Sequence, residues 1–235
     1  MSSTTTDAPL MEVRDIYKSF GRLEILRGIS LQLHRGEILA IVGASGAGKT
    51  TLLQVIGTLD APDRGEVIIG GERLSALSGN RRAAFRNRHL GFVFQSHQLM
   101  PEFTAVENVA IPAMISGKSR REAMAEAGEL LRHLSLGDRL DHRPAELSGG
   151  ERQRVAVARA IINHPEIVLA DEPTGALDSV RKRELLELFL RLREEEGLSF
   201  IVVTHDRETA EIADRSLLLS DGRIVSEQGG DEAPI

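Results

Sequence analysis

The sequence predicts an α/β fold in which a mixed β-sheet is flanked by helices and carries a helical insertion. Two short apolar runs, residues 38–42 and 167–170, are typical of parallel strands that are buried on both faces. Between the strand-like runs lie stretches whose apolar residues recur at helical spacing, which is the order expected of an α/β protein. The 235 residues suit one domain, since domains hold about 100 to 200 residues.

The strands can be placed by pattern. Ile29, Leu31 and Leu33 alternate along the chain and so put apolar side chains on one face of a half-buried strand. Further strands are predicted at residues 66–69, 90–94, 199–204, 217–219 and 224–225. A helix is predicted over residues 50–57, directly after the strand at 38–42.

The middle of the chain has a different pattern and predicts a helical insertion over about residues 95–162. A Ser-x-x-Glu capping box begins a helix after Ser119, and apolar residues follow at helical spacing. A second capping box begins a helix after Ser148, which Pro165 ends.

The two ends of the chain lack these patterns. Residues 1–10 and 227–235 are expected to form flexible tails, which leaves residues 11–226 as the domain. Met11 is a second candidate for the start of the protein. The first ten residues lack the basic start and apolar core of a secretory signal.

Composition excludes several classes of protein. The 29 Lys and Arg against 35 Asp and Glu give a net charge of −6, which argues against a nucleic-acid partner. The chain has no cysteine, which excludes disulfides, thiolate catalysis and cysteine metal sites. The apolar runs are far shorter than the roughly 20 residues that cross a bilayer.

A glycine-rich segment after the strand at 38–42 matches GxxxxGK[ST], the pattern of a phosphate-binding loop. Its residues are Gly43, Ala44, Ser45, Gly46, Ala47, Gly48, Lys49 and Thr50, with Thr51 next in the helix. Glycines let backbone N–H groups point at phosphate oxygens, and the helix adds the positive end of its dipole. Lys49 is predicted to contact the phosphates and Thr50 to offer its hydroxyl to Mg²⁺. A chance match in a glycine-rich turn is the alternative, which the flanking strand and helix disfavour.

Two carboxylates and a histidine follow other predicted strands. Asp171 and Glu172 end the strand at 167–170, where a parallel sheet presents carboxylates to a metal. Asp171 is predicted to orient Mg²⁺ and Glu172 to take a proton from the attacking water. His205 follows the strand at 199–204, so it is expected at the same edge near the γ-phosphate. Adjacent acids and a lone histidine are otherwise common on protein surfaces.

The segment LSGGERQ, residues 147–153, fits no general nucleotide-kinase or GTPase pattern. It resembles the signature of the ATP-binding cassette family, and the resemblance covers about residues 11–226. The resemblance implies a P-loop NTPase fold of the RecA-like kind, in which the helical insertion carries the signature. It also implies ATP and Mg²⁺ as cofactors and ATP hydrolysis coupled to transport.

The resemblance also implies roles for single residues. Gln95 is then the Q-loop glutamine, near both the reaction and Mg²⁺, Glu172 is the catalytic carboxylate and His205 is the switch histidine. Residues 175–178 are then the D-loop, with Asp178 among the residues that bind ATP. Phe20 aligns with the position that stacks on adenine better than Tyr17 does.

The signature residues Ser148, Gly149 and Gly150 present a hydroxyl and bare N–H groups at the start of a helix, which is a second anion site. In the family such a site closes on the ATP held by a second copy of the chain. The plain alternative is an ordinary helix cap, and both interpretations can hold together.

Three stretches, beginning GASGAGKTT, GFVFQSHQL and ADEPTGALD, are similar to the cassette ATPases of lipoprotein release and macrolide export. This similarity implies two copies bound beneath integral membrane permeases of that type, peripheral at the cytoplasmic face of the bacterial inner membrane. The implied activity extracts lipoproteins from the inner membrane for transfer to the outer membrane. The alternatives are a macrolide or peptide exporter, or a non-transport cassette ATPase that regulates a cell-envelope or division partner.

Two surfaces are hypothesised for membrane partners. An apolar set after Gln95 is interpreted as a groove for a permease helix, with packing of the helical segment as the alternative. Its members are His97, Leu99, Met100, Phe103, Val106 and Val109. A basic run is interpreted either as a contact for lipid headgroups or partner acids, or as a solvated helix face. It consists of Arg81, Arg82, Arg86 and Arg88.

Overall fold

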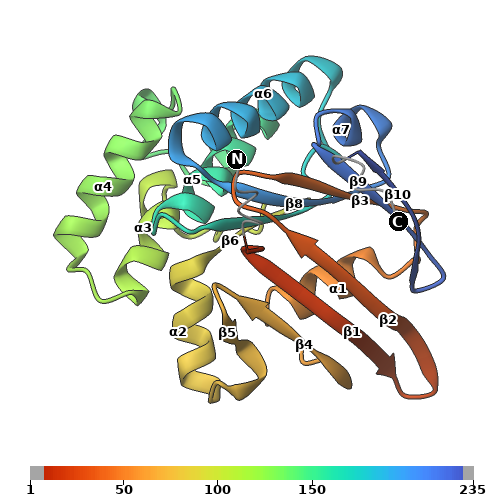
Figure 1. Ribbon diagram of the computed structural model, residues 1–235. Helices are drawn as coiled ribbons and strands as arrows, with labels where there is room; N and C mark the ends of the chain where they lie inside the picture. The colour runs from red at the N-terminus through yellow and green to blue at the C-terminus, as the bar shows by residue number, and fades with distance from the viewer. Residues whose placement is uncertain (1–7, 230–235) are drawn as a thin grey trace, which may run out of the picture.

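The computed structural model describes residues 8–229, and its centre is a six-stranded sheet in the order β10-β9-β3-β8-β7-β6 (Figure 1). The strands are β3 (Ile38–Val42), β6 (Leu90–Phe94), β7 (Ile167–Asp171), β8 (Ser199–Thr204), β9 (Arg215–Ser220) and β10 (Arg223–Gly229). All neighbours pair in parallel except β10, which is antiparallel to β9. The predicted α/β class is therefore confirmed, and the continuous apolar runs are central parallel strands.

A separate four-stranded antiparallel sheet has the order β2-β1-β4-β5, so the strands form two sheets where the sequence predicted one. The strands are β1 (Met11–Phe20), β2 (Leu23–Leu33), β4 (Arg64–Ile69) and β5 (Glu72–Arg73). The pairing of β1 with β2 shifts register between Val13 and Ile16, and again further along. These shifts break the two-residue alternation of β1, which explains why the sequence pattern did not reveal this strand.

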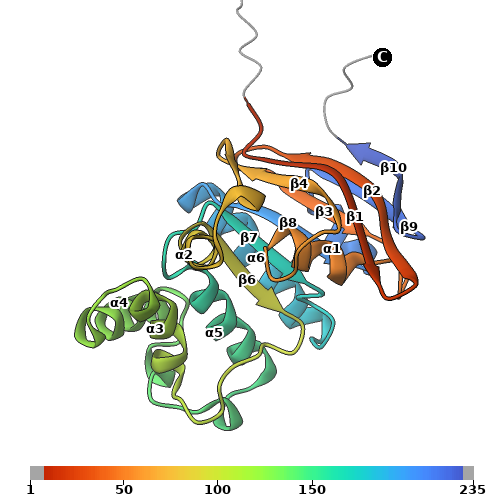
Figure 2. The ribbon, with the colours of Figure 1, turned by 90° about the horizontal axis from the view of Figure 1, so that it is seen from below.

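The helices cover both faces of the central sheet. Helix α1 (Lys49–Ile56) lies between the two sheets and shares one apolar core with them (Figure 2). On the other face, α5 (Gly149–Ile161) and α6 (Ser179–Glu196) share a second core with the sheet. The remaining helices are α2 (Gly79–His89), α3 (Ala105–Ile115), α4 (Arg120–His133) and α7 (Arg207–Glu211), with short 3₁₀ turns at Leu74–Ala76, Gly137–Arg139 and Pro144–Glu146.

Within the predicted helical insertion, α3, α4 and α5 pack against one another. The capping boxes predicted at Ser119 and Ser148 are present at the starts of α4 and α5. A third, at Thr104, begins α3. Each box satisfies backbone N–H groups that the first turn of a helix leaves without partners.

Ordered structure extends past both predicted domain boundaries. Leu10 is 2% exposed and its carbonyl accepts a hydrogen bond from Gly70 N, because it continues the edge of β1 into the core. At the other end β10 pairs with β9 as far as Gly229, so residues 227–229 belong to the sheet and not to a tail. Residues 1–7 and 230–235 of the predicted tails lie outside the described residues. None of the helices within residues 8–229 is long and apolar enough to cross a membrane.

Candidate functional site

The strands β3, β7 and β8 end at one edge of the central sheet, where a cavity of about 740 Å³ opens. It is lined by Ile25, Ala44, Ser45, Gly46, Gly48, Lys49, Thr50, Thr51, Gln95, Glu172 and His205. Most of the residues predicted for nucleotide binding and hydrolysis therefore lie around one space, although they come from distant parts of the sequence.

The phosphate-binding loop joins β3 to α1 in the predicted strand–loop–helix context. Gly48 has φ 101°, a left-handed conformation that glycine adopts without strain. A Cβ at Gly43 would lie 2.3 Å from the Leu219 carbonyl oxygen, so only glycine lets the loop pass β9. Lys49 is 7% exposed, and its ammonium donates to the carbonyls of Gly43, at 2.8 Å, and Ala44, at 3.1 Å. The loop thus holds its own cation at the floor of the cavity.

Glu172 directly follows β7, and several hydrogen-bond donors converge on its carboxylate. Its Oε1 lies 2.8 Å from His205 Nδ1 and 3.6 Å from Lys49 Nζ. Its Oε2 accepts from the Thr204 hydroxyl and from the His205 N–H, each at 3.3 Å. The carboxylate, 13% exposed, is therefore fixed between a cation and an imidazole, in an orientation suited to a general base.

Asp171 is the last residue of β7, and its Oδ1 accepts a hydrogen bond from the Thr50 hydroxyl at 3.3 Å. Burial raises the pKa of Asp171, and the neighbouring Glu172 charge raises it further. The two side chains offer the oxygen donors that Mg²⁺ prefers. Within residues 8–229 no group of three or more His, Cys, Asp or Glu side chains forms a metal site. The pair therefore suits an ion that takes its other ligands from a nucleotide and water.

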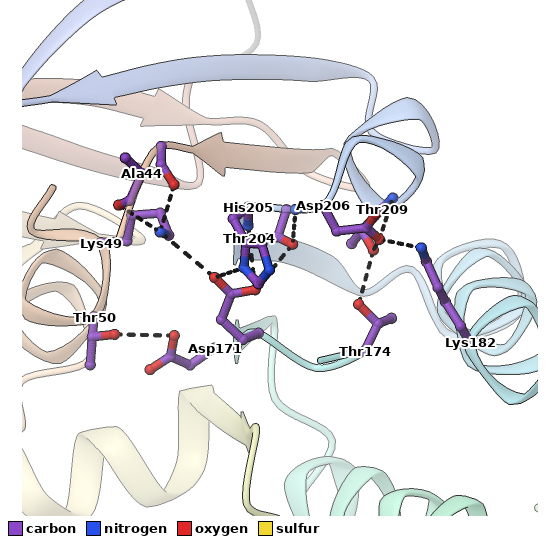
Figure 3. A network of polar contacts seen from close by, with 12 residues as sticks. Ala44, Lys49, Thr50, Asp171, Thr174, Lys182, Thr204, His205, Asp206 and Thr209 are labelled. Carbon is purple, nitrogen blue, oxygen red and sulfur yellow. Dashed lines mark hydrogen bonds and ion pairs between the residues drawn. The ribbon is translucent and has the colours of Figure 1, made fainter. Parts of the chain in front are cut away.

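The loop that carries His205 is anchored by residues that the sequence analysis missed. Thr204 accepts from the Asp206 N–H while it donates to Glu172. Asp206 contacts the ammonium of Lys182 at 2.6 Å and the hydroxyl of Thr209 at 2.6 Å (Figure 3). Burial alone would raise the pKa of Asp206, but the bonds from Lys182 and Thr209 outweigh it and lower that pKa. The sequence offered one signal for these anchors, since Thr204 and Asp206 lie on either side of a histidine at the end of a strand.

Gln95 follows β6 and reaches the same cavity from the opposite side. A Cβ at Gly175 would lie 2.8 Å from Gln95 Nε2, so this glycine makes room for the glutamine side chain. The predicted D-loop and Q-loop therefore touch beside the cavity.

The signature residues and Asp178 do not line this cavity. Ser148 is the N-cap of α5, and its hydroxyl accepts from the Glu151 N–H. The Ser148 N–H and the Arg139 guanidinium lower the pKa of Glu151 to about 2. Asp178 is the N-cap of α6 and accepts from both the N–H and the guanidinium of Arg181. Ser148 and Asp178 are exposed at the starts of these helices, outside the cavity of their own chain.

The two aromatic candidates for adenine differ in their surroundings. Phe20 is 53% exposed at the end of β1, with Lys18 Nζ 5.2 Å from its ring centre. The Tyr17 ring is covered by Arg64 at 4.8 Å. Neither residue lines the cavity, whereas Ile25, across the hairpin from Phe20, does. Phe20 remains the predicted stacking partner because its ring has a free face.

The predicted docking groove was wrong in its details. Val106 and Val109 are buried in the helical core, so they line no surface. A groove of about 460 Å³ is present beside them, and of the predicted set only Met100 lines it. Its other walls include Leu59, Arg86, Phe92, Phe94, Gln98, Pro112, Ile115 and Arg159. Helix α2 supplies Arg86, which is half-buried and donates to the Thr58 carbonyl at 3.1 Å, whereas Arg81 and Arg88 are exposed.

Comparisons with known proteins agree with this geometry. The ABC transporter family matches residues 26–175. The lipoprotein-releasing system ATP-binding protein LolD of Porphyromonas gingivalis is 57% identical over 218 residues, which cover 93% of this chain and all of that protein. Its counterpart in Bacteroides thetaiotaomicron is 55% identical, over 92% of this chain and 99% of that protein.

Among solved structures, a dimeric ATP-binding cassette in a post-hydrolysis state with bound ADP and Pi superimposes with a TM-score of 0.85. It is 37% identical and covers 93% of this chain and 98% of that one. The dimeric structure of a bacterial ABC transporter cassette gives a TM-score of 0.86 at 38% identity, with the same coverage. With the phosphate-binding loop, the strand-end carboxylates and the signature helix in the same fold, this chain belongs to the ABC transporter family and is an ATP-hydrolysing cassette of that family.

Proposed function

We propose that this chain is the ATP-hydrolysing subunit of a bacterial inner-membrane complex that releases lipoproteins for transfer to the outer membrane. The observation that carries the proposal is the 57% identity with a lipoprotein-releasing ATP-binding protein across that protein's whole length. Three further relatives with the same name are 50 to 55% identical over 92% of this chain. Hydrolysis rests on the cluster of Lys49, Glu172 and His205 at one cavity.

The residues divide the work of hydrolysis among them. Lys49 and the amides of the loop at 43–50 bind and orient the β- and γ-phosphates. Glu172 takes a proton from the water that attacks the γ-phosphorus, and His205 holds the carboxylate in place. The products are ADP and inorganic phosphate, as the reaction adds one water and breaks one phosphoanhydride bond.

Mg²⁺ fits the oxygen donors of this site. The hydroxyl of Thr50 and the carboxylate of Asp171, 3.3 Å apart, would hold the ion together with Gln95. When bound, Mg²⁺ neutralises charge on the phosphate oxygens.

Two copies of the chain form the working unit in this proposal. The Ser148–Gly150 end of α5 and Asp178 do not line the cavity of their own chain, as expected if they bind the ATP of a second copy. The two dimeric cassettes that superimpose on this chain support that arrangement. ATP then holds the closed pair together, and loss of the γ-phosphate reopens it.

Integral membrane permeases of the lipoprotein-releasing or macrolide-export type are the proposed partners, at the cytoplasmic face of the inner membrane. The groove beside β6 is the proposed docking surface, since it is mostly apolar with two arginines on its walls. It lies close to Gln95 along the chain, so a bound permease can influence the nucleotide cavity.

The test is to purify a tagged chain with its membrane partners and to place the complex in liposomes that hold a fluorescent lipoprotein. ATP is expected to release the lipoprotein to a soluble acceptor, and the same complex with Glu172→Gln serves as the matched control. ATP hydrolysis without lipoprotein release, but with macrolide or peptide transport, would assign the chain to the exporter alternative.

A further inference from the structure

The loop that leaves the nucleotide cavity is strained where it turns. After Gln95 it passes through His97 with φ 60° and Gln98 with φ 48°, two successive left-handed residues that are not glycine. Such conformations persist only where other contacts hold them. The buried His97 Nε2 has no hydrogen-bond partner within residues 8–229, so the imidazole tip does not supply the restraint.

The N–H groups of this turn bond to Phe94 O and Ser96 O, and one side chain on α5 restrains its carbonyls. Arg159 donates from Nη1 to the Gln98 carbonyl at 2.7 Å and from Nη2 to the His97 carbonyl at 2.8 Å. No acidic side chain in the described part of the chain pairs with Arg159, and burial lowers its pKa. The planar guanidinium therefore donates to the carbonyls of His97 and Gln98, because its fork of N–H groups can reach two acceptors at once.

Arg159 is itself fixed by close packing. Its neighbour Ala160 lies against Gly91 of β6, where a Cβ would come within 2.4 Å of the Ala160 carbonyl oxygen. The far end of the loop is held separately by Asn108, which is fully buried. Its side chain accepts from Met100 N at 2.8 Å and donates to the carbonyls of Met100, Phe103 and Thr104 at 3.0 to 3.1 Å.

The same guanidinium lines the docking groove, as do Gln98 and Met100. Gln95 stands two residues before His97 and lines the nucleotide cavity. We infer that Arg159 is a positioning residue for hydrolysis: it holds the strained turn that follows Gln95 and so places the Gln95 side chain. This inference rests on the proposed function and adds a residue to it.

A double-mutant cycle on the full chain tests whether Arg159 acts through Gln95. Arg159→Lys keeps the charge but cannot span both carbonyls, and it is expected to lower kcat/KM for MgATP about tenfold. It is also expected to raise the Mg²⁺ concentration that gives half-maximal rate. In a Gln95→Ala background, Arg159→Lys is expected to change kcat/KM by less than about twofold. The matched control is Arg154→Lys on the same helix, where Arg154 pairs with Glu184 at the surface.

Each outcome decides the inference. If the losses from Gln95→Ala and Arg159→Lys multiply, or if Arg159→Lys is as active as Arg154→Lys, the inference is overturned. If Arg159→Lys does not fold, Arg159→Gln takes its place in the cycle, since its amide can still donate to one of the two carbonyls and the same outcomes decide the inference. An unaltered chain that hydrolyses no ATP would instead reject the proposed function.

Discussion

Glu172 is the residue on which the proposed hydrolysis depends most directly. Its carboxylate takes hydrogen bonds from Thr204 and from both the N–H and the ring of His205, with Lys49 nearby. Its φ of 46° is left-handed, which tilts the side chain back across the end of β7 toward β8. A general base needs a carboxylate in a fixed orientation, because proton transfer is slower when the accepting oxygen is mobile.

Glu172→Gln is expected to keep ATP binding and to lower turnover by roughly a hundredfold or more, since the amide cannot take the proton. The variant should accumulate an ATP-bound dimer, which light scattering after size exclusion would detect beside a phosphate-release assay. Turnover equal to that of the unaltered chain would remove Glu172 from the reaction.

Lys49→Ala is expected to act on binding instead. It removes a cation held at the cavity floor by two loop carbonyls, so affinity for ATP should fall roughly ten- to a hundredfold by calorimetry. Lys118→Ala is the matched control, because Lys118 pairs with Glu126 outside the cavity. Equal affinities in the two variants would contradict the assignment of the loop.

At the scale of elements, the cap of α5 ties stability to pH. Glu151 has a pKa of about 2 in the folded chain, against an ordinary value of 4.5 for a glutamate side chain. Its stabilising effect is therefore complete above about 4.5 and is lost as the pH falls from there toward 2.

Glu151→Ala is expected to destabilise the fold by about 1 kcal/mol near pH 7, since it removes the partner of the Ser148 N–H and of Arg139. Urea unfolding at a series of pH values would measure the difference. That difference should shrink below pH 4.5 and nearly vanish near 2. A difference that stays constant over this range would show that the carboxylate charge is not involved.

Sequence patterns predicted the elements that obey one simple rule. Buried parallel strands appeared as continuous apolar runs, and the loop with Lys49 followed from its spacing and its place after β3. Asp171, Glu172 and His205 could be predicted to lie close together because parallel strands end at a common edge of the sheet. Strand β1 was not predicted because its register shifts break the alternation of apolar and polar residues.

The walls of the docking groove could not be predicted from the sequence for a different reason. Val106 and Val109 face the helical core, and the real walls come from α2, β6, α3 and α5, which no local pattern relates. The anchors of the His205 loop, Lys182 of α6 and Thr209 of α7, are likewise set by tertiary packing. Positions such as Ser148 and Asp178 are predictable as helix caps, but the function proposed for them depends on a second copy.

At the scale of the whole molecule, dimer closure can be tested without disturbing the fold. Gly149 is the first residue of α5, and a Cβ there would meet nothing within 4 Å. Gly149→Asp should therefore change stability by less than about 0.5 kcal/mol, because an acid suits a helix start. The added charge should repel the phosphates of the second copy, so ATP should no longer produce a dimer in the Glu172→Gln background.

Gly79→Asp is the matched control for that experiment. Gly79 is the first residue of α2, follows a serine N-cap, and also has open space around its Cβ position. Light scattering should find an ATP-dependent dimer with Gly79→Asp and only monomer with Gly149→Asp. Dimers in both would place the contact between copies elsewhere.

The cap at Ser148 has a further consequence for how the two copies separate and rejoin. In accepting from the Glu151 N–H, the serine oxygen uses a lone pair, and its hydrogen, which bonds the Glu151 carboxylate, can turn to donate to another acceptor. The Ser148 hydroxyl can thus cap the start of α5 and donate to a phosphate oxygen at the same time. The dimer can then form and dissociate repeatedly without unfolding the start of α5, the part proposed to bind ATP.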